Sequence, residues 1–352
     1  MFLPLRSARH TPAEPSLLVG LFVTLAAVFP AVHPAAAQDN HGVHLPDPIA
    51  SEPDPAAVRY GVQPVDGLDI FYREAGTPPG KSTPGNPDRP AVVLLHGFPS
   101  SSHQYRDVLA ALGDEFYLIA PDYPGFGDSS FPPPEEYDYR FDQLAQTIDR
   151  FLEAKQIDRY VLVIHDYGAP VGFRIALAHP ERLAGLVVQN GNAYEQGIGP
   201  DGWGPVLDYW KNKTPELEKT IAQNVFGLEG LRWQYTHGTR HPDRILPDNW
   251  NLDYLKLSRP GQHRVQLDLF YDYQNNLKQY PAWQAFLREH QPPTLVTWGV
   301  HDAFFPVPGA EGYARDLDDV EIHLLDTGHF PLEEDGPFII RKMRDFLHRL
   351  GD

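Results

Sequence analysis

Residues 160–172, YVLVIHDYGAPVG, join a continuous apolar run to a segment of small residues. The run at 160–164 has the length and composition of a strand that is buried on both faces of a sheet. Gly168 and Ala169 allow a sharp turn into a helix, and Asp166 stands on that turn. An Asp after a strand is more often the N-cap of the next helix. The same strand–turn–helix arrangement can also present a nucleophile above the carboxyl edge of a sheet.

Strands and helices alternate on both sides of this stretch. A hairpin is predicted at 60–75, and buried strands at 91–95, 116–120, 160–165, 183–189, 294–298 and 320–325. Helical patterns occupy 105–112, 141–155, 168–179 and 337–350. Such alternation predicts right-handed βαβ units, and therefore an α/β fold with a mainly parallel, twisted sheet flanked by helices.

The alternation stops between Tyr194 and Arg288, where helical patterns with many aromatic residues replace it. An insertion of this length is typical of a functional lid. We therefore predict one core in two parts, at 58–193 and 291–352, with a helical lid at 194–290 inserted before the last two strands.

The N-terminus has the layout of a secretory signal peptide. Arg6 and Arg9 precede an apolar segment at 17–29, and a run of alanines ending at Ala37 supplies a small-residue cleavage site. The apolar segment is short for a membrane span. We expect export to the periplasm or the extracellular space, with no stable membrane anchor after cleavage. The predicted boundaries are 1–37 for the signal peptide and 38–57 for a flexible leader.

Composition excludes several classes of function. The chain of 352 residues carries a formal net charge of −18, which argues against nucleic acid or an anionic membrane as a partner. It contains no cysteine, so a thiolate nucleophile, a disulfide and a Cys-based metal site are excluded. We expect a small-molecule substrate and no metal or cofactor, while the oligomeric state is open.

Two further polar residues follow predicted strands. Asp302 closes Gly299-Val300-His301-Asp302 after the strand at 294–298, and His329 follows the last strand. Because the carboxyl ends of parallel strands meet at one edge of a sheet, both should lie near Asp166. Asp302 alone could cap a helix and His329 could be a loop histidine. The chain order of nucleophile, acid and histidine instead predicts a catalytic triad of Asp166, Asp302 and His329.

The segment His96-Gly97-Phe98 follows another predicted strand. A loop at this place supplies one backbone N–H to an oxyanion hole, and the residue after the nucleophile supplies the other. We therefore predict that the amides of Phe98 and Tyr167 form the hole.

From about Tyr60 onward the chain resembles the α/β-hydrolase family, in its branch with an aspartate nucleophile. That branch includes epoxide hydrolases and haloalkane or haloacid dehalogenases. The resemblance implies that Asp166 attacks an sp³ carbon to form an alkyl ester, and that His329, oriented by Asp302, activates the water that cleaves it. The motifs that carry it are His96-Gly97-Phe98-Pro99, Asp122 to Ser129, His165-Asp166-Tyr167-Gly168, Gly299 to Asp302 and Gly328-His329-Phe330.

The leaving group separates the two branches. Epoxide hydrolases use two lid tyrosines, whereas haloalkane dehalogenases use indole or amide N–H donors, typically a Trp directly after the nucleophile. That position is Tyr167 here, and Phe98 replaces the Asn of many dehalogenases, so the resemblance favours an epoxide hydrolase.

Tyr209 and Tyr273 are the lid residues that resemble the epoxide donors, with Tyr271 as the competitor of Tyr273. Trp210 is a lid indole that could donate to a halide, so a dehalogenase is the alternative function. An esterase or lactonase, or a non-catalytic binding protein on the same fold, is a minor alternative. The polar run at 189–192 could contact substrate or form an ordinary loop.

Overall fold

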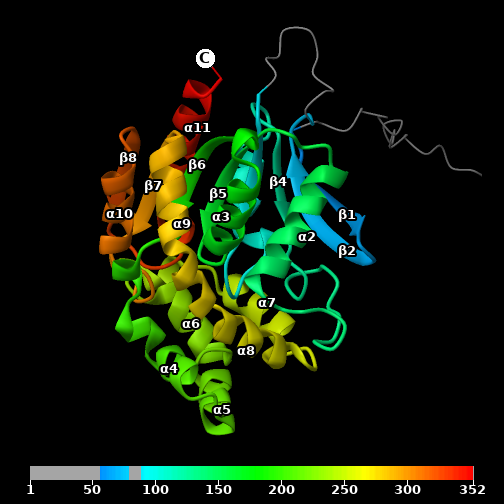
Figure 1. The fold of residues 1–352 in the computed structure, drawn as a ribbon, viewed down its shortest axis with the longest axis vertical. Coiled ribbons are helices and arrows are strands. Elements are labelled where there is room, and N and C mark those ends of the chain that lie inside the picture. Colours follow the sequence, from blue (N-terminus) through cyan, green and yellow to red (C-terminus); the bar gives the residue numbers. More distant parts are fainter. Residues whose placement is uncertain (1–55, 79–88, 352) are drawn as a thin grey trace, which may run out of the picture. The chain divides into compact units, whose positions relative to one another are not determined.

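The computed structural model of the protein describes residues 56–78 and 89–351. Eight strands form one sheet in the order β1-β2-β4-β3-β5-β6-β7-β8 (Figure 1). Strands β1 and β2 form the antiparallel hairpin, β2 pairs antiparallel with β4, and all other pairs are parallel. The strands are β1 (Arg59–Val65), β2 (Leu68–Ala75), β3 (Ala91–Leu95), β4 (Leu118–Pro121), β5 (Tyr160–His165), β6 (Leu183–Gln189), β7 (Thr294–Gly299) and β8 (Val320–Leu325).

Helices cover both faces of the sheet. On β3, Val92 and Leu94 face one hydrophobic core while Val93 and Leu95 face the other, which explains the uninterrupted apolar run. The helices α1 (Arg106–Leu112) and α11 (Pro331–Arg349) contribute to the first core. The second core contains α2 (Phe141–Ala154), α3 (Gly168–Ala178), α9 (Gln274–His290) and α10 (Pro308–Asp316).

Five helices form a lid beyond the carboxyl ends of the parallel strands (Figure 1). They are α4 (Pro200–Lys211), α5 (Pro215–Asn224), α6 (Leu228–Thr236), α7 (Pro247–Leu257) and α8 (Gln262–Asp272). Three of them begin with a proline, whose fixed φ suits the first helical position. The lid is tied to the core by buried hydrogen bonds: Asp272 accepts the N–H of Phe141 at 2.9 Å, and Gln262 donates to the carbonyl of Gly125 at 2.6 Å.

Helix α9 follows the lid and returns to the sheet, where Trp283 stacks on Phe173 of α3 with ring centroids 5.1 Å apart. Short 3₁₀ helices in the described ranges are Ser102–Tyr105, Pro180–Arg182, Glu195–Gly197 and Pro242–Arg244.

The prediction of an α/β-hydrolase fold with a helical insertion before the last two strands is confirmed. The last helix begins at Pro331, earlier than the predicted 337, and its backbone is non-helical at Asp335. Pro337 has no N–H to donate into the preceding turn, which accounts for the kink. The predicted signal peptide and nearly all of the predicted leader lie outside the described residues. Across 56–78 and 89–351, no helix is both long enough and apolar enough to cross a membrane.

Candidate active site

Asp166 stands at the tip of the turn between β5 and α3. Its φ is +48°, in the left-handed region that non-glycine residues seldom adopt outside sites where the surrounding structure enforces it. A Cβ at Gly168 would overlap the carbonyl oxygen of Leu95, and a Cβ at Gly97 would stand 2.6 Å from Asp166 Oδ1. Both glycines are therefore required for the turn to pack so closely against the loop after β3.

Two backbone amides contact this carboxylate. The N–H of Phe98 donates to Asp166 Oδ1 at 2.6 Å, and the N–H of Tyr167 also donates to the carboxylate. The structure thus places both amides of the predicted oxyanion hole on Asp166. Phe98 holds Oδ1, and Oδ2 is the oxygen that faces His329.

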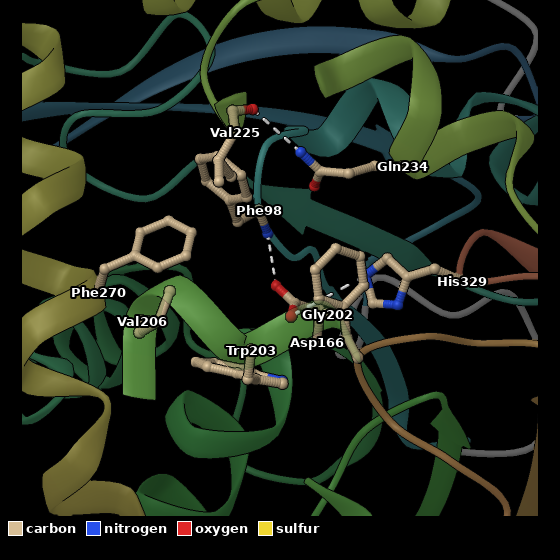
Figure 2. A pocket seen from close by; sticks show the side chains of 10 residues that line it. Phe98, Asp166, Gly202, Trp203, Val206, Val225, Gln234, Phe270 and His329 are labelled. Atoms are coloured by element: carbon tan, nitrogen blue, oxygen red, sulfur yellow. Dashed lines mark hydrogen bonds and ion pairs between the residues drawn. The ribbon is translucent and has the colours of Figure 1, made fainter. Parts of the chain in front are cut away.

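His329 lies beside the carboxylate and is oriented by Asp302 (Figure 2). Its Nδ1 is 2.8 Å from Asp302 Oδ2, and its Nε2 is 4.0 Å from Asp166 Oδ2. The second distance exceeds that of a hydrogen bond. The imidazole is therefore close to Asp166 without being bonded to it, so a water could be activated between them.

Asn190 is a fourth polar residue at this edge, and its place in the sequence did not distinguish it from an ordinary loop residue. Its Nδ2 donates to Asp302 Oδ2 at 2.7 Å, while its Oδ1 accepts the N–H of Gly299 at 3.0 Å. Asp302 Oδ1 accepts the N–H of Phe304 at 2.7 Å. Asp302 is thereby fixed on both oxygens. The only sequence signal was that Asn190 follows β6, the strand between those that carry Asp166 and Asp302.

The electrostatics suit a carboxylate paired with a charged imidazole. Burial raises the pKa of Asp166 to about 6, although His329 and the two amides oppose this rise. Burial alone would lower the pKa of His329, but the carboxylates of Asp302 and Asp166 outweigh it and raise that pKa. Burial also lowers the pKa of neighbouring His165 far below its usual range, so that side chain is neutral; its Nε2 lies 2.9 Å from the carbonyl of His329.

A small cavity of about 20 Å³ lies beside Asp166 and His329, between the core and the lid (Figure 2). Its walls are mostly apolar and aromatic, which is typical of sites for small molecules. Trp203 of α4 is buried in this wall, and its indole N–H has no hydrogen-bond partner. The lining residues are Phe98, Asp166, Gly202, Trp203, Val206, Val225, Gln234, Phe270, Phe304 and His329.

Residues 90–336 match the family model described as alpha/beta hydrolase fold. The chain belongs to the α/β-hydrolase fold family. An uncharacterized hydrolase of Saccharomyces cerevisiae is 43% identical to this α/β-hydrolase over 274 residues, which cover 77% of this chain and 91% of the relative. Haloalkane dehalogenase 2 of Mycobacterium tuberculosis is 38% identical over 262 residues, covering 70% and 84%.

Solved structures share the fold of this α/β-hydrolase. The epoxide hydrolase CorEH has a TM-score of 0.67 at 20% identity, covering 84% of this chain and 100% of its own. A mutant of the haloalkane dehalogenase DatA from Agrobacterium tumefaciens has a TM-score of 0.68 at 20% identity, covering 83% and 97%. The protein is thus a hydrolase of the α/β fold whose relatives and structural neighbours include both kinds of enzyme.

The structure does not bring Tyr209 of the α/β-hydrolase to the pocket. Its hydroxyl donates to Glu218 at 2.7 Å, and its ring packs against Tyr271 with centroids 5.4 Å apart. Tyr271, the competitor of Tyr273, is absent from the pocket lining as well. The indole N–H of Trp210 is occupied by the carbonyl of Phe270 at 2.7 Å. Two tyrosines therefore do not converge on Asp166 in the way the resemblance implied.

Tyr273 does lie close to the site. Its ring centroid is 4.4 Å from that of Trp203 and 5.9 Å from that of Tyr167. Its hydroxyl is fully buried and makes no well-formed hydrogen bond. Burial first, and then the nearby hydroxyl of Tyr280 and the charge of Asp166, keep the pKa of Tyr273 well above its usual value. Tyr273 is therefore a protonated phenol that lies beside the hydroxyl of Tyr280 and, like Tyr271, is not among the described residues that line the pocket.

The lid also supports the loop that carries His329. Tyr235 of α6 stacks on Phe330 with centroids 4.0 Å apart and ring planes 15° apart, and its hydroxyl donates to Asp253 of α7 at 2.6 Å. A Cβ at Gly328 would overlap the carbonyl oxygen of His237. The loop is thus held from the lid side as well as from the sheet.

Away from the pocket of the α/β-hydrolase, Asp149, Glu153 and His179 form a group whose ligand atoms are close enough to hold a metal ion. Asp149 already pairs with His179 at 2.9 Å and with Arg182 at 3.0 Å. These pairs satisfy the charge of Asp149, so the group is explained as a surface ion-pair network.

Proposed function

We propose that the protein opens epoxides to diols through a covalent ester of Asp166. In the first step Asp166 Oδ2 attacks an epoxide carbon, a C–O bond forms and the ring C–O bond breaks. The ring oxygen becomes an alkoxide that stays attached to the substrate and takes the proton of Tyr273. The observation that carries this proposal is the fully buried hydroxyl of Tyr273, which makes no well-formed hydrogen bond, on a ring that packs against Trp203 of the pocket wall and against Tyr167.

The second step is hydrolysis of the ester. His329 removes a proton from water, the water oxygen attacks Cγ of Asp166, and the amides of Phe98 and Tyr167 stabilise the oxyanion. Collapse of this intermediate breaks the ester C–O bond, and the departing diol oxygen takes the proton held by His329. The proton left on the carboxyl group returns to Tyr273, so one epoxide and one water give one diol.

The charges at the site favour this order of events. In the free enzyme the carboxylate of Asp166 helps to raise the pKa of His329. Formation of the ester removes that negative charge, so the pKa of His329 falls as the base is needed. Asp302, itself held by Asn190, continues to orient the imidazole during both steps.

The second candidate is a haloalkane dehalogenase, and Trp203 is the observation that favours it. Its buried N–H lines the pocket without a partner and could donate to a departing halide. A relative named haloalkane dehalogenase 2 is 38% identical. Haloacids are disfavoured within this candidate because no Lys or Arg is among the described pocket residues to pair with their carboxylate.

Trapping of the covalent ester distinguishes these candidates. His329→Gln should form the ester but hydrolyse it slowly, because attack at carbon does not need the base. The variant is incubated with 1,2-epoxyhexane or with 1-bromohexane, and the peptide containing Asp166 is analysed by mass spectrometry. An epoxide adds its whole mass, whereas the bromide adds only its alkyl group.

We expect the epoxide adduct on His329→Gln and none on the double variant that also carries Asp166→Asn. Tyr273→Phe should slow formation of this adduct by about 10²–10³, which is typical when one donor to a developing oxyanion is removed. An adduct from the bromide alone, lost in Trp203→Phe, would establish a dehalogenase. The absence of any adduct would contradict the covalent mechanism.

A further inference from the structure

Gln234 is a polar residue of the pocket that the reaction described above does not use. It lies on α6, is 3% exposed, and lines the pocket together with Asp166 and His329. Its Nε2 donates to the carbonyl of Val225 at 3.2 Å. Because a carbonyl can only accept, this bond fixes which end of the amide faces Val225, and the oxygen must point the other way.

Figure 2 shows that Oε1 of Gln234 is directed into the pocket, on the side opposite Trp203 and with Asp166 between them. This oxygen accepts no hydrogen bond from any residue in the described ranges. The residues that line the same pocket are mostly apolar, among them Phe98 and Val225. Because the oxygen faces the pocket space, a ligand that fills the pocket must donate to it or leave it without a partner, which is costly.

The pocket therefore has two polar ends. Trp203, with Tyr273 packed against it, marks the side of Asp166 on which a leaving group would depart, and Gln234 offers an acceptor on the other side. A substrate whose reacting carbon lies at Asp166 would place a neighbouring substituent at Gln234. An alkyl substituent there would leave the amide oxygen without a partner, whereas a hydroxyl would satisfy it.

We propose that Gln234 Oε1 accepts a hydrogen bond from the substrate, and that the preferred substrates are small uncharged molecules with a hydroxyl group next to the reacting carbon. The choice of leaving group rests on the proposed function, in which it is the epoxide oxygen. The substrates are then 2,3-epoxy alcohols. A charged substituent is disfavoured: no Lys or Arg is among the described pocket residues, the charge of His329 is already met by Asp302 and Asp166, and an ammonium group would neutralise the Asp166 nucleophile.

The test compares two epoxides that differ only in this group: glycidol, and 1,2-epoxybutane, in which a methyl replaces the hydroxyl. The wild-type protein should prefer glycidol in kcat/KM by roughly tenfold, the effect of one buried hydrogen bond. Gln234→Met keeps the length of the side chain but removes the acceptor, and should bring the ratio close to one. The variant also loses the hydrogen bond to the carbonyl of Val225. That loss acts on both substrates, so it cannot change the ratio of their kcat/KM values.

Gln266→Met is the matched control. Gln266 is a fully buried glutamine of α8 that does not line the pocket, and the same substitution there should leave the preference for glycidol unchanged. If wild type shows no preference, or if Gln234→Met retains it, the role of Gln234 is refuted while the proposed function stands.

The bromide pair 2-bromoethanol and 1-bromopropane, in which a methyl replaces the hydroxyl, separates the two proposals. Turnover of bromides alone, with a preference for the alcohol that Gln234→Met abolishes, would refute the epoxide assignment and retain the role of Gln234. Turnover of none of the four compounds would contradict both.

Discussion

Replacing Asn190 with glycine tests whether the second support of Asp302 is needed for the base but not for the nucleophile. Asn190 has a φ of +43°, which glycine adopts without strain, so Asn190→Gly removes the side chain alone. The lost contacts are the bonds to Asp302 Oδ2 at 2.7 Å and to the carbonyl of Gly299 at 3.4 Å, and the bond from the N–H of Gly299 at 3.0 Å. Asp166 touches neither of these groups, and its alkylation should proceed normally.

The magnitude follows from the charge of the acceptor. A hydrogen bond to a charged group contributes about 1.5–3 kcal/mol, and 1.36 kcal/mol corresponds to a factor of ten in rate. If this energy is expressed in the orientation of His329, hydrolysis of the ester should slow by roughly 10- to 150-fold. Rapid mixing with excess substrate, followed by mass spectrometry, measures both steps, because slow hydrolysis makes the Asp166 ester accumulate.

Asn190→Ala is the comparison variant, since it removes the same contacts but adds strain at a positive φ. It should match Asn190→Gly in kinetics and unfold at a lower temperature. The reasoning is refuted if Asn190→Gly hydrolyses the ester at the wild-type rate, or if ester formation slows as much as hydrolysis.

Three further outcomes are expected. Ester formation should fall as the pH is lowered through about 6, because burial raises the pKa of Asp166 to about 6 and only the ionised form attacks; a rate that halves only near about 4, the ordinary range of aspartate, would contradict this. Tyr209→Phe should leave kcat unchanged and cost about 1 kcal/mol of stability in chemical denaturation, because its hydroxyl bonds only Glu218; a large loss of activity would return Tyr209 to the site. Gly97→Ala should abolish ester formation and destabilise the fold by about 1–3 kcal/mol, because its Cβ would press on Asp166; an active, stable variant would show that this close approach is dispensable.

The sequence was sufficient for the core of the site because the fold itself gathers those residues. Asp166, Asp302 and His329 each follow a parallel strand, and all such strands end at one edge of the sheet. The amides of Phe98 and Tyr167 are placed by the same rule. No side-chain packing had to be known for these positions.

The lid is different because nothing in its sequence says which face of a helix looks into the pocket. Tyr209 and Trp203 share α4, but the rise of 1.5 Å per residue puts Tyr209 about 9 Å further along the axis. Its surroundings are then set by packing against α5 and α8. There its hydroxyl bonds Glu218 and its ring packs against Tyr271. A sequence signal for Trp203 did exist: Gly202, just before it, lets α4 approach the loop at Ala303, next to Asp302.

The contact between the lid and the histidine loop has a consequence for engineering. Segments of α4, α5 and α8 could be exchanged with those of another hydrolase to import a new set of pocket walls. The stretch from Tyr235 to Gly238 cannot be treated as part of such a transferable module, because Tyr235 stacks on Phe330 and His237 closes over Gly328. A chimera that replaces the whole insertion would gain a foreign pocket but lose the side chains that support the loop of its own catalytic histidine, so a chimera should keep Tyr235 to Gly238 from the parent that supplies the core.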